Sequence, residues 1–154
     1  SGGLEAELPV GSPPRFIEVR QLIGKTGKPE SATIVGLDDA VTRQSDVERA
    51  FHGIHPSDSR LILTHVPSLI VPVSEFGGGL ALAGHTHGGH VQIPGLTDRI
   101  FRKLGYDYVR GFYRVGDSLL YVNSGVGSSS VPIRAGAPAE LAILTLRMAR
   151  PDQS

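Results

Sequence analysis

Several things that this 154-residue chain lacks narrow what it can be. It contains no cysteine, which excludes a disulfide framework and any zinc site ligated by cysteine. No apolar run approaches the ~18 residues that cross a membrane, so we predict no transmembrane segment. The 15 basic and 15 acidic side chains cancel, which gives no support to a strongly basic nucleic-acid surface, and we expect no nucleic-acid partner.

The residues that are present predict a folded, turn-rich chain. Hydrophobic residues make up 40% of it and charged residues 19%, which argues against disorder, and the length suits one domain. The 20 glycines and 11 prolines favour many turns and short strands over a helical bundle. We therefore expect an α/β (α+β) chain, strand-rich, with antiparallel hairpins in its C-terminal half. Residues 1–14 are interpreted as a tail or linker, and 150–154 as a second tail.

Short apolar runs between turn signals predict the individual elements. A helix is expected to begin where Ser45 caps it and Glu48 completes a capping box, and to end near Phe51. Two further helices are expected at 68–76 and 98–104. The expected strands are 16–22, 32–37, 61–64, 80–83, the hairpin pair 111–115 and 119–122, and 140–146.

Histidine clustering is the main sign of chemistry. Three of the six histidines lie in the segment Gly84-His85-Thr86-His87-Gly88-Gly89-His90, whose glycines permit a tight loop. Neutral imidazole is a common ligand for zinc, iron and manganese. Because His65 also ends a buried strand, we expect the strands before His65 and His85 to share one sheet edge. The segment predicts a metal site, with ordinary loop histidines as the alternative, whereas His52 and His55 are interpreted as surface histidines at a helix end.

The motifs around these histidines resemble a known family. The segment Leu63-Thr64-His65-Val66-Pro67, followed by Ala83-Gly84-His85-Thr86-His87-Gly88-Gly89, is similar to the last two metal motifs of the calcineurin-like metallophosphoesterases. The likeness runs over about residues 31–147 and is greatest to a bacterial membrane-associated subgroup of phosphohydrolases. Further segments that resemble this subgroup occur in the same order, at 34–39, 111–116, 120–125 and 132–140.

This resemblance implies a fold, a metal site and a reaction. Residues 15–149 would be the C-terminal portion of a single metallophosphoesterase domain, a β-sandwich flanked by helices with two divalent metal ions at its strand ends. His65 and His85 would bind one metal and His87 the other. Zinc, manganese and iron all suit such ligands. A pair of cations polarises a phosphoester, generates a hydroxide nucleophile near neutral pH and stabilises the leaving oxygen.

The chain departs from the family pattern in the motifs that would come first. Before His65 it has no Asp-x-His, Gly-Asp or Gly-Asn-His motif, and its sole asparagine is Asn123. Two divalent cations at ~3.5 Å repel by roughly 19 kcal/mol at an effective dielectric of ~20, and neutral imidazoles supply no compensating charge. Asp38 or Asp39 could lie nearby, but nothing in the sequence makes either one a bridge. We therefore expect this chain alone to bind at most one metal weakly and to be inactive, with the general-acid histidine outside it.

Other side chains near the motifs are candidates for substrate binding. His90 follows the metal motif and would line a pocket, with a plain exposed histidine as the alternative. Arg134 lies in a segment that resembles the subgroup, and its guanidinium suits a phosphate, with a solvated arginine as the alternative. Tyr106, Tyr108 and Tyr113 are interpreted either as a platform for a lipid or sugar or as half-buried hairpin tyrosines.

Taken together, these patterns predict a metal-dependent phosphoester hydrolase, a phosphatase or phosphodiesterase using a metal-bound hydroxide. The alternative is a non-catalytic binding or scaffold module on the same fold, because half of the family's ligands are absent. The expected partners are a phosphoester substrate, cell-envelope or lipid-linked by the subgroup resemblance, and the missing N-terminal half or a second copy. Uncovered strands favour such association. The location stays open between the cytoplasm and the periphery of a bacterial membrane.

Overall fold

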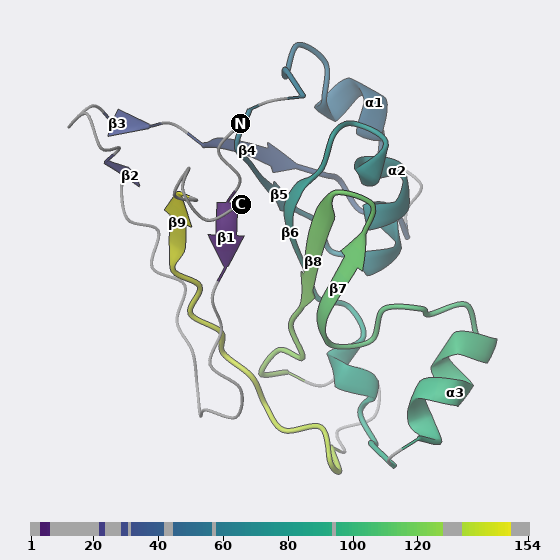
Figure 1. Cartoon of the computed structure of the whole chain (residues 1–154). Coiled ribbons are helices and arrows are strands. Elements are labelled where there is room, and N and C mark those ends of the chain that lie inside the picture. Colours follow the sequence, from purple (N-terminus) through teal and green to yellow (C-terminus); the bar gives the residue numbers. More distant parts are fainter. Residues whose placement is uncertain are drawn as a thin grey trace.

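A five-stranded mixed sheet with the strand order β4-β5-β6-β8-β7 forms the centre of this computed structural model (Figure 1). The structure describes residues 4–6, 22–23, 29–30, 32–41, 45–56, 58–93, 95–127 and 134–148. The parallel strands are β4 (Thr33–Gly36), β5 (Arg60–Leu63), β6 (Gly79–Ala83) and β8 (Ser118–Val122). Strand β7 (Gly111–Val115) pairs antiparallel with β8. The α/β class predicted from the sequence is confirmed.

The two strands that precede the histidine motifs are neighbours, as predicted. In the register of β5 and β6, Leu61 lies opposite Leu80 and Leu63 opposite Leu82. Since the strands are parallel, their carboxyl ends reach the same edge of the sheet. The continuous apolar runs suit strands that are buried on both faces, which is the usual setting of a parallel sheet. The predicted hairpin is confirmed as β7 and β8.

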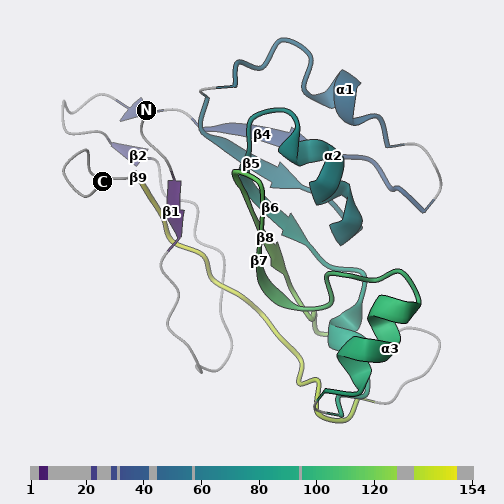
Figure 2. The same ribbon diagram turned by 45° about the vertical axis from the view of Figure 1, so that its right-hand side comes forward.

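Short helices cover one face of this sheet. Helix α1 (Val47–Ala50) and helix α2 (Ile70–Ser74), which follows the 3-10 turn η1 (Pro67–Leu69), lie on the same side in both views (Figures 1 and 2). The core on this side consists of Val35, Phe51, Ile62, Ile70, Val73, Ala81, Ala83, Leu120 and Val122. Helix α3 (Thr97–Lys103) stands apart from that core, beside the 3-10 turn η2 (His87–Gly89) (Figure 2). The helices expected at 68–76 and 98–104 are confirmed in position.

The start of α1 lies one residue later than the sequence pattern predicts. Asp46, not Ser45, is the N-cap residue, and its carboxylate accepts a hydrogen bond from the Arg49 N–H at 2.9 Å. Aspartate is as good a cap as serine, and a carboxylate also suits the positive end of the helix. The prediction that Ser45 caps this helix is therefore wrong by one position.

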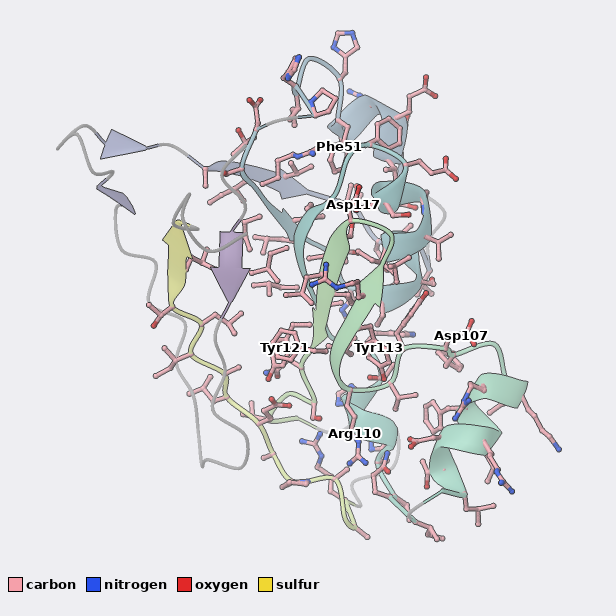
Figure 3. All side chains as sticks on the ribbon, viewed as in Figure 1. Phe51, Asp107, Arg110, Tyr113, Asp117 and Tyr121 are labelled. Atoms are coloured by element: carbon pink, nitrogen blue, oxygen red, sulfur yellow. The ribbon has the colours of Figure 1, made fainter. Side chains whose placement is uncertain are left out.

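The strand expected at 140–146 is not formed. Residues 137–145 have no strand pairing, and Leu146 begins β9 (Leu146–Met148), which pairs antiparallel with β1 (Leu4–Ala6). Ala142 and Leu144 are instead buried against Tyr121, on the face of the sheet away from α1 and α2 (Figure 3). The alternation of apolar residues therefore reflects an extended segment lying across a sheet face, because alternation requires an extended backbone but not a paired edge.

The remaining strands lie outside the five-stranded sheet. Strands β2 (Leu22–Ile23) and β3 (Pro29–Glu30) form a separate antiparallel pair, and β1 places a paired strand within residues 1–14, predicted as a tail or linker. Most of the strand expected at 16–22, the loop beyond Gly127 and the tail at 150–154 lie outside the described residues. Within the ranges that the structure describes, no helix has the length and apolar character needed to span a membrane.

Candidate metal centre

The candidate site lies on the segments that follow the parallel strands. Beyond the strand ends the backbone ladder continues, since the Thr64 N–H donates to the Leu82 carbonyl at 3.0 Å and the Gly84 N–H donates to the His65 carbonyl at 3.2 Å. These bonds hold the loop after β5 against the loop after β6. Carboxyl ends of parallel strands are where α/β proteins build their binding sites. His65 and His85 therefore come together because of the topology of the sheet.

The imidazoles of His65 and His85 meet directly. Nδ1 of His85 lies 3.1 Å from Nε2 of His65, and the two rings are arranged edge to face with centroids 4.9 Å apart. Two nitrogens that ligate one zinc at ~2.0–2.1 Å in a tetrahedral site are about 3.3 Å apart. The pair thus has close to the separation that a single divalent cation requires of two of its ligands.

Electrostatics keep His85 in the form that binds metals. Burial lowers the pKa of His85 below its ordinary value, and the neighbouring His65 lowers this pKa further, whereas the carboxylate of Asp39 raises it. His87 adds a smaller lowering effect on the same pKa. A neutral imidazole at neutral pH has the free lone pair that metal ligation requires. Asp39, one of the two acidic residues that the sequence left as candidates, therefore lies within electrostatic range of the pair.

The histidine loop has a strained backbone. Among the described residues, the positive φ angles outside glycine are those of His85 (69°), His87 (50°) and His90 (52°). Such conformations cost of order 1–3 kcal/mol each and gather at functional sites. The rest of the fold therefore holds the backbone of these three residues in a conformation that they would not favour by themselves.

Gly88 shows why this loop needs glycine. Its φ is +62°, and a Cβ at this position would lie 2.7 Å from Oγ of Ser124, which follows β8. The Gly88 carbonyl also accepts a hydrogen bond from Nε2 of Gln92 at 2.6 Å. Glycine is thus required both by the backbone angle and by the close approach of a neighbouring segment, as the sequence pattern suggested.

His87 and His90 form a second pair beside the first. Their rings stack with centroids 4.9 Å apart, and Nδ1 of His87 lies 3.3 Å from the carbonyl oxygen of Gly127. A histidine that ligates a metal commonly donates its other ring N–H to a backbone carbonyl, which fixes the ring and directs the free nitrogen away. The structure therefore leaves Nε2 of His87 as the nitrogen for a ligand, and it places His90 against His87 and not between His65 and His85.

Arg134 binds the protein backbone. Its guanidinium donates to the carbonyls of Gly125 at 2.7 Å, of Ser124 at 2.5 Å and of His87 at 3.1 Å. These bonds connect the loop after β8 to the turn η2. The side chain thus holds the segment that carries Ser124 and Gly125 against the segment that carries His87, a positional role that the sequence did not indicate.

The described residues bring two candidate metal ligands together. His65 and His85 fit one cation as a pair of ligands, yet in the ranges 32–41, 45–56, 58–93, 95–127 and 134–148 no group of three or more His, Asp or Glu side chains is arranged to hold a metal ion. Asp39 contributes charge near the pair without joining such a group. The spacing of the pair therefore suits a divalent cation, and the described residues supply no third His, Asp or Glu ligand beside it.

Tyr106, one of the three tyrosines that the sequence offered as a platform for a lipid or sugar, is a neighbour of the site. Its ring lies 6.1 Å from that of His85 and 5.6 Å from that of Phe101, so it links the site to α3. Tyr108 and Tyr113 are half-buried, contact each other edge to face at 5.1 Å and pack against the core, which favours the hairpin interpretation for these two. No local sequence signal indicates the contact of Tyr106 with His85, because this contact depends on the path of the loop that leads from α3 to β7.

Comparison with known proteins identifies the family. The chain is 32% identical over 114 residues to the uncharacterized metallophosphoesterase YkuE of Bacillus subtilis, and 35% identical over 117 residues to the uncharacterized metallophosphoesterase Cj0846 of Campylobacter jejuni. Each match covers 74% of the chain. Over this matched region the chain belongs to the calcineurin-like metallophosphoesterase family. The resemblance inferred from the motifs is confirmed.

A further relative carries a more specific name. The chain is 28% identical over 123 residues, 75% of its length, to the UDP-2,3-diacylglucosamine pyrophosphatase LpxG of Chlamydia trachomatis. The chain spans 40% of YkuE, 29% of Cj0846 and 37% of LpxG, less than half of each relative. No family model and no solved structure matches the chain.

Proposed function

We propose that this chain contributes the histidine side of a metal-dependent phosphoester hydrolase centre. In this proposal His65 and His85 bind one divalent cation, and His87 binds a second. The single observation that carries the proposal is the 3.1 Å separation of the two imidazole nitrogens at adjacent strand ends. A bound divalent cation polarises a phosphoester and lowers the pKa of water, so that hydrolysis proceeds near neutral pH.

The chain's own residues have distinct tasks in this proposal. Burial keeps His85 neutral, so its Nδ1 is available to a cation at neutral pH. The Gly127 carbonyl orients the ring of His87, and Asp39 offsets part of the positive charge that would collect beside His85. Arg134 positions the loop through the His87 carbonyl, and His90 lines the substrate side of His87.

Carboxylates from outside this chain complete the site in our proposal. The family's missing motifs would supply the bridging acid and the general-acid histidine, which is why we expect the chain alone to hold at most one cation weakly and to be inactive. The substrate is a phosphoester or pyrophosphate. The name of the relative LpxG, a pyrophosphatase for a diacylated sugar nucleotide, favours a lipid-linked substrate over a soluble one. Zinc, manganese and iron all remain compatible with the imidazoles.

Calorimetric titration of the 154-residue chain with Mn²⁺ or Zn²⁺ tests the metal site directly. We expect a single weak site that is lost in His65→Asn and in His85→Asn. The matched control is His52→Asn, since His52 is exposed and follows α1, away from the histidine loop. Two tight sites in the chain, or unchanged binding by His85→Asn, would contradict the proposal, as would hydrolysis of bis-p-nitrophenyl phosphate by the pure chain.

A non-catalytic scaffold is the second candidate, favoured by the lack of a three-ligand group within the described ranges. The two candidates differ in what they require of the imidazoles. A scaffold has no need of metal affinity at His65 and His85, so a chain that binds no divalent cation in the same titration would favour the scaffold.

A further inference from the structure

Exposed apolar side chains gather on and around α3. Leu96, Ile100 and Leu104 recur every four residues and so form one stripe along the helix, and all three are exposed, Leu104 by 66%. Ile93 on the preceding loop is exposed as well. A soluble surface has scattered apolar residues, but a contiguous apolar group of this kind indicates a surface for interaction.

The other side of α3 is fixed to the molecule. Thr97 is buried, its hydroxyl donates to the Val91 carbonyl at 2.8 Å, and it accepts from the Ile93 N–H at 2.9 Å. One turn later, Phe101 contacts Tyr106 and approaches Gly89. Because Thr97 and Phe101 lie on the same side of the helix, the stripe of Leu96, Ile100 and Leu104 is directed elsewhere.

Cations lie next to the stripe. Arg99 and Lys103 are exposed and lie within about 100° of Ile100 around the helix axis, whereas Arg102 and Asp98, the helix's sole acidic residue, lie on the opposite side. Figure 3 shows Asp107 on the segment that leads from α3 towards β7, so it lies beyond the helix. A helix with an apolar stripe bordered by lysine and arginine is the type that lies in a membrane interface, with its cations attracted to anionic head groups.

We propose that α3 docks this protein on an anionic lipid surface. The stripe of Leu96, Ile100 and Leu104 enters the boundary of the acyl chains, while Arg99 and Lys103 face the head groups. The charge of the helix argues for lipid, because an apolar protein partner has no need of two cations beside the contact. Tyr106 connects α3 to His85, so docking places the histidine site next to the head-group layer.

Vesicle cosedimentation of the 154-residue chain tests the proposal. We expect binding to vesicles of phosphatidylcholine and phosphatidylglycerol in equal parts and little binding to phosphatidylcholine alone. Replacing two cations, in Arg99→Gln with Lys103→Gln, should weaken binding about thirtyfold. Replacing two stripe residues, in Ile100→Asn with Leu104→Asn, should weaken it at least roughly tenfold.

Matched controls come from elsewhere on the surface. Val71→Asn removes an apolar side chain of similar exposure (49%) on α2, and Arg114→Gln removes an exposed cation on β7. We expect neither to change binding. Circular dichroism and thermal unfolding show whether each variant is folded. If the double variant unfolds, the single variant Leu104→Asn, which lies just beyond the helix end, still tests the contribution of the stripe.

Several results would overturn the proposal. These are no sedimentation with either vesicle, equal sedimentation with both, or unchanged binding by the stripe variants. A stripe variant that turns a dimer into a monomer, while the parent chain ignores vesicles, would assign the stripe to self-association. Cosedimentation involves neither a metal nor hydrolysis. A failure of the lipid-docking proposal is therefore distinguishable from a failure of the proposed enzymatic function.

Discussion

At the scale of single residues, the histidine loop depends on a glycine that no side chain can replace. Gly88 combines a positive φ with a 2.7 Å approach of its Cβ position to Ser124. Substituting alanine forces either the backbone or the loop after β8 to move, and His87 lies next to it. The loop geometry that gathers the imidazoles is therefore sensitive to one methyl group.

We expect Gly88→Ala to destabilise the chain by about 1–3 kcal/mol and to weaken divalent cation binding. Gly36→Ala is the matched control, because a Cβ at Gly36 meets nothing within 4 Å and its φ is not in the positive range. Urea unfolding measures the first effect and calorimetry the second. Equal stability of the two variants would show that the loop relaxes without cost.

The lowered pKa of His85 predicts how stability without metal depends on pH. Because the folded-state pKa lies below the ordinary value of 6.5, the unfolded chain takes up this proton first as the pH falls. The stabilisation is complete above the unfolded-state pKa and is lost as the pH falls towards the folded-state pKa. With a chelator present, the thermal midpoint should therefore fall less between neutral pH and about pH 5 in His85→Asn than in the parent.

His52→Asn serves as the control for this comparison, since His52 is exposed on the turn after α1. It should follow the parent over the whole pH range. If His85→Asn loses as much stability on acidification as the parent does, burial of the His85 imidazole has no effect on folding.

At the scale of elements, α1 depends on its cap. This helix has a single turn, Val47–Ala50, and the Asp46 carboxylate satisfies the Arg49 N–H at its start. A helix this short gains little from its own hydrogen bonds, so capping and the burial of the following Phe51 stabilise it.

Asp46→Ala should cost about 1 kcal/mol of stability, whereas Ser45→Ala should cost much less. Urea unfolding of the two variants separates the cap seen in the structure from the cap expected from the sequence pattern. A larger loss of stability in Ser45→Ala than in Asp46→Ala would show that Ser45 caps the helix, as the sequence pattern predicts.

At the scale of the whole molecule, the sheet has an incompletely covered region among the described residues. Ile34 on β4 is 60% exposed and Leu63 on β5 is 42% exposed. Both lie on the face away from α1 and α2, since Val35 and Ile62 point to the helix side. Strand β4 is also one of the two edge strands of the five-stranded sheet. An exposed apolar edge of this kind favours pairing with another chain or segment.

We therefore expect the 154-residue chain to associate at micromolar concentration, and Ile34→Lys to shift it towards the monomer. Light scattering measures both, with Val71→Lys on α2 as the control that should leave association unchanged. A parent chain that is monomeric throughout this range would contradict the expectation.

Local patterns predicted the elements better than they predicted contacts. Short apolar runs identified β4, β5, β6 and the β7–β8 hairpin, because burial and turn residues leave a direct mark on the sequence. The pattern at 140–146 failed, since alternation is the same for an extended segment lying on a sheet face as for a paired strand. Long-range contacts such as that of Tyr106 with His85 leave no local mark at all.

The sequence by itself determined the chemistry that is available: which side chains carry imidazole, where glycine permits a tight loop, and to which family the motifs belong. Only the tertiary structure decided which of these groups meet. Parallel pairing of β5 and β6 brings His65 to His85 across 20 positions of sequence. The loop after β4 places Asp39 near them, and the side chain of Arg134 binds the backbone carbonyl of His87. The reason is that the pairing register of two strands decides which of their end residues become neighbours. This register is set by the burial of the strands themselves and not by the residues that follow them.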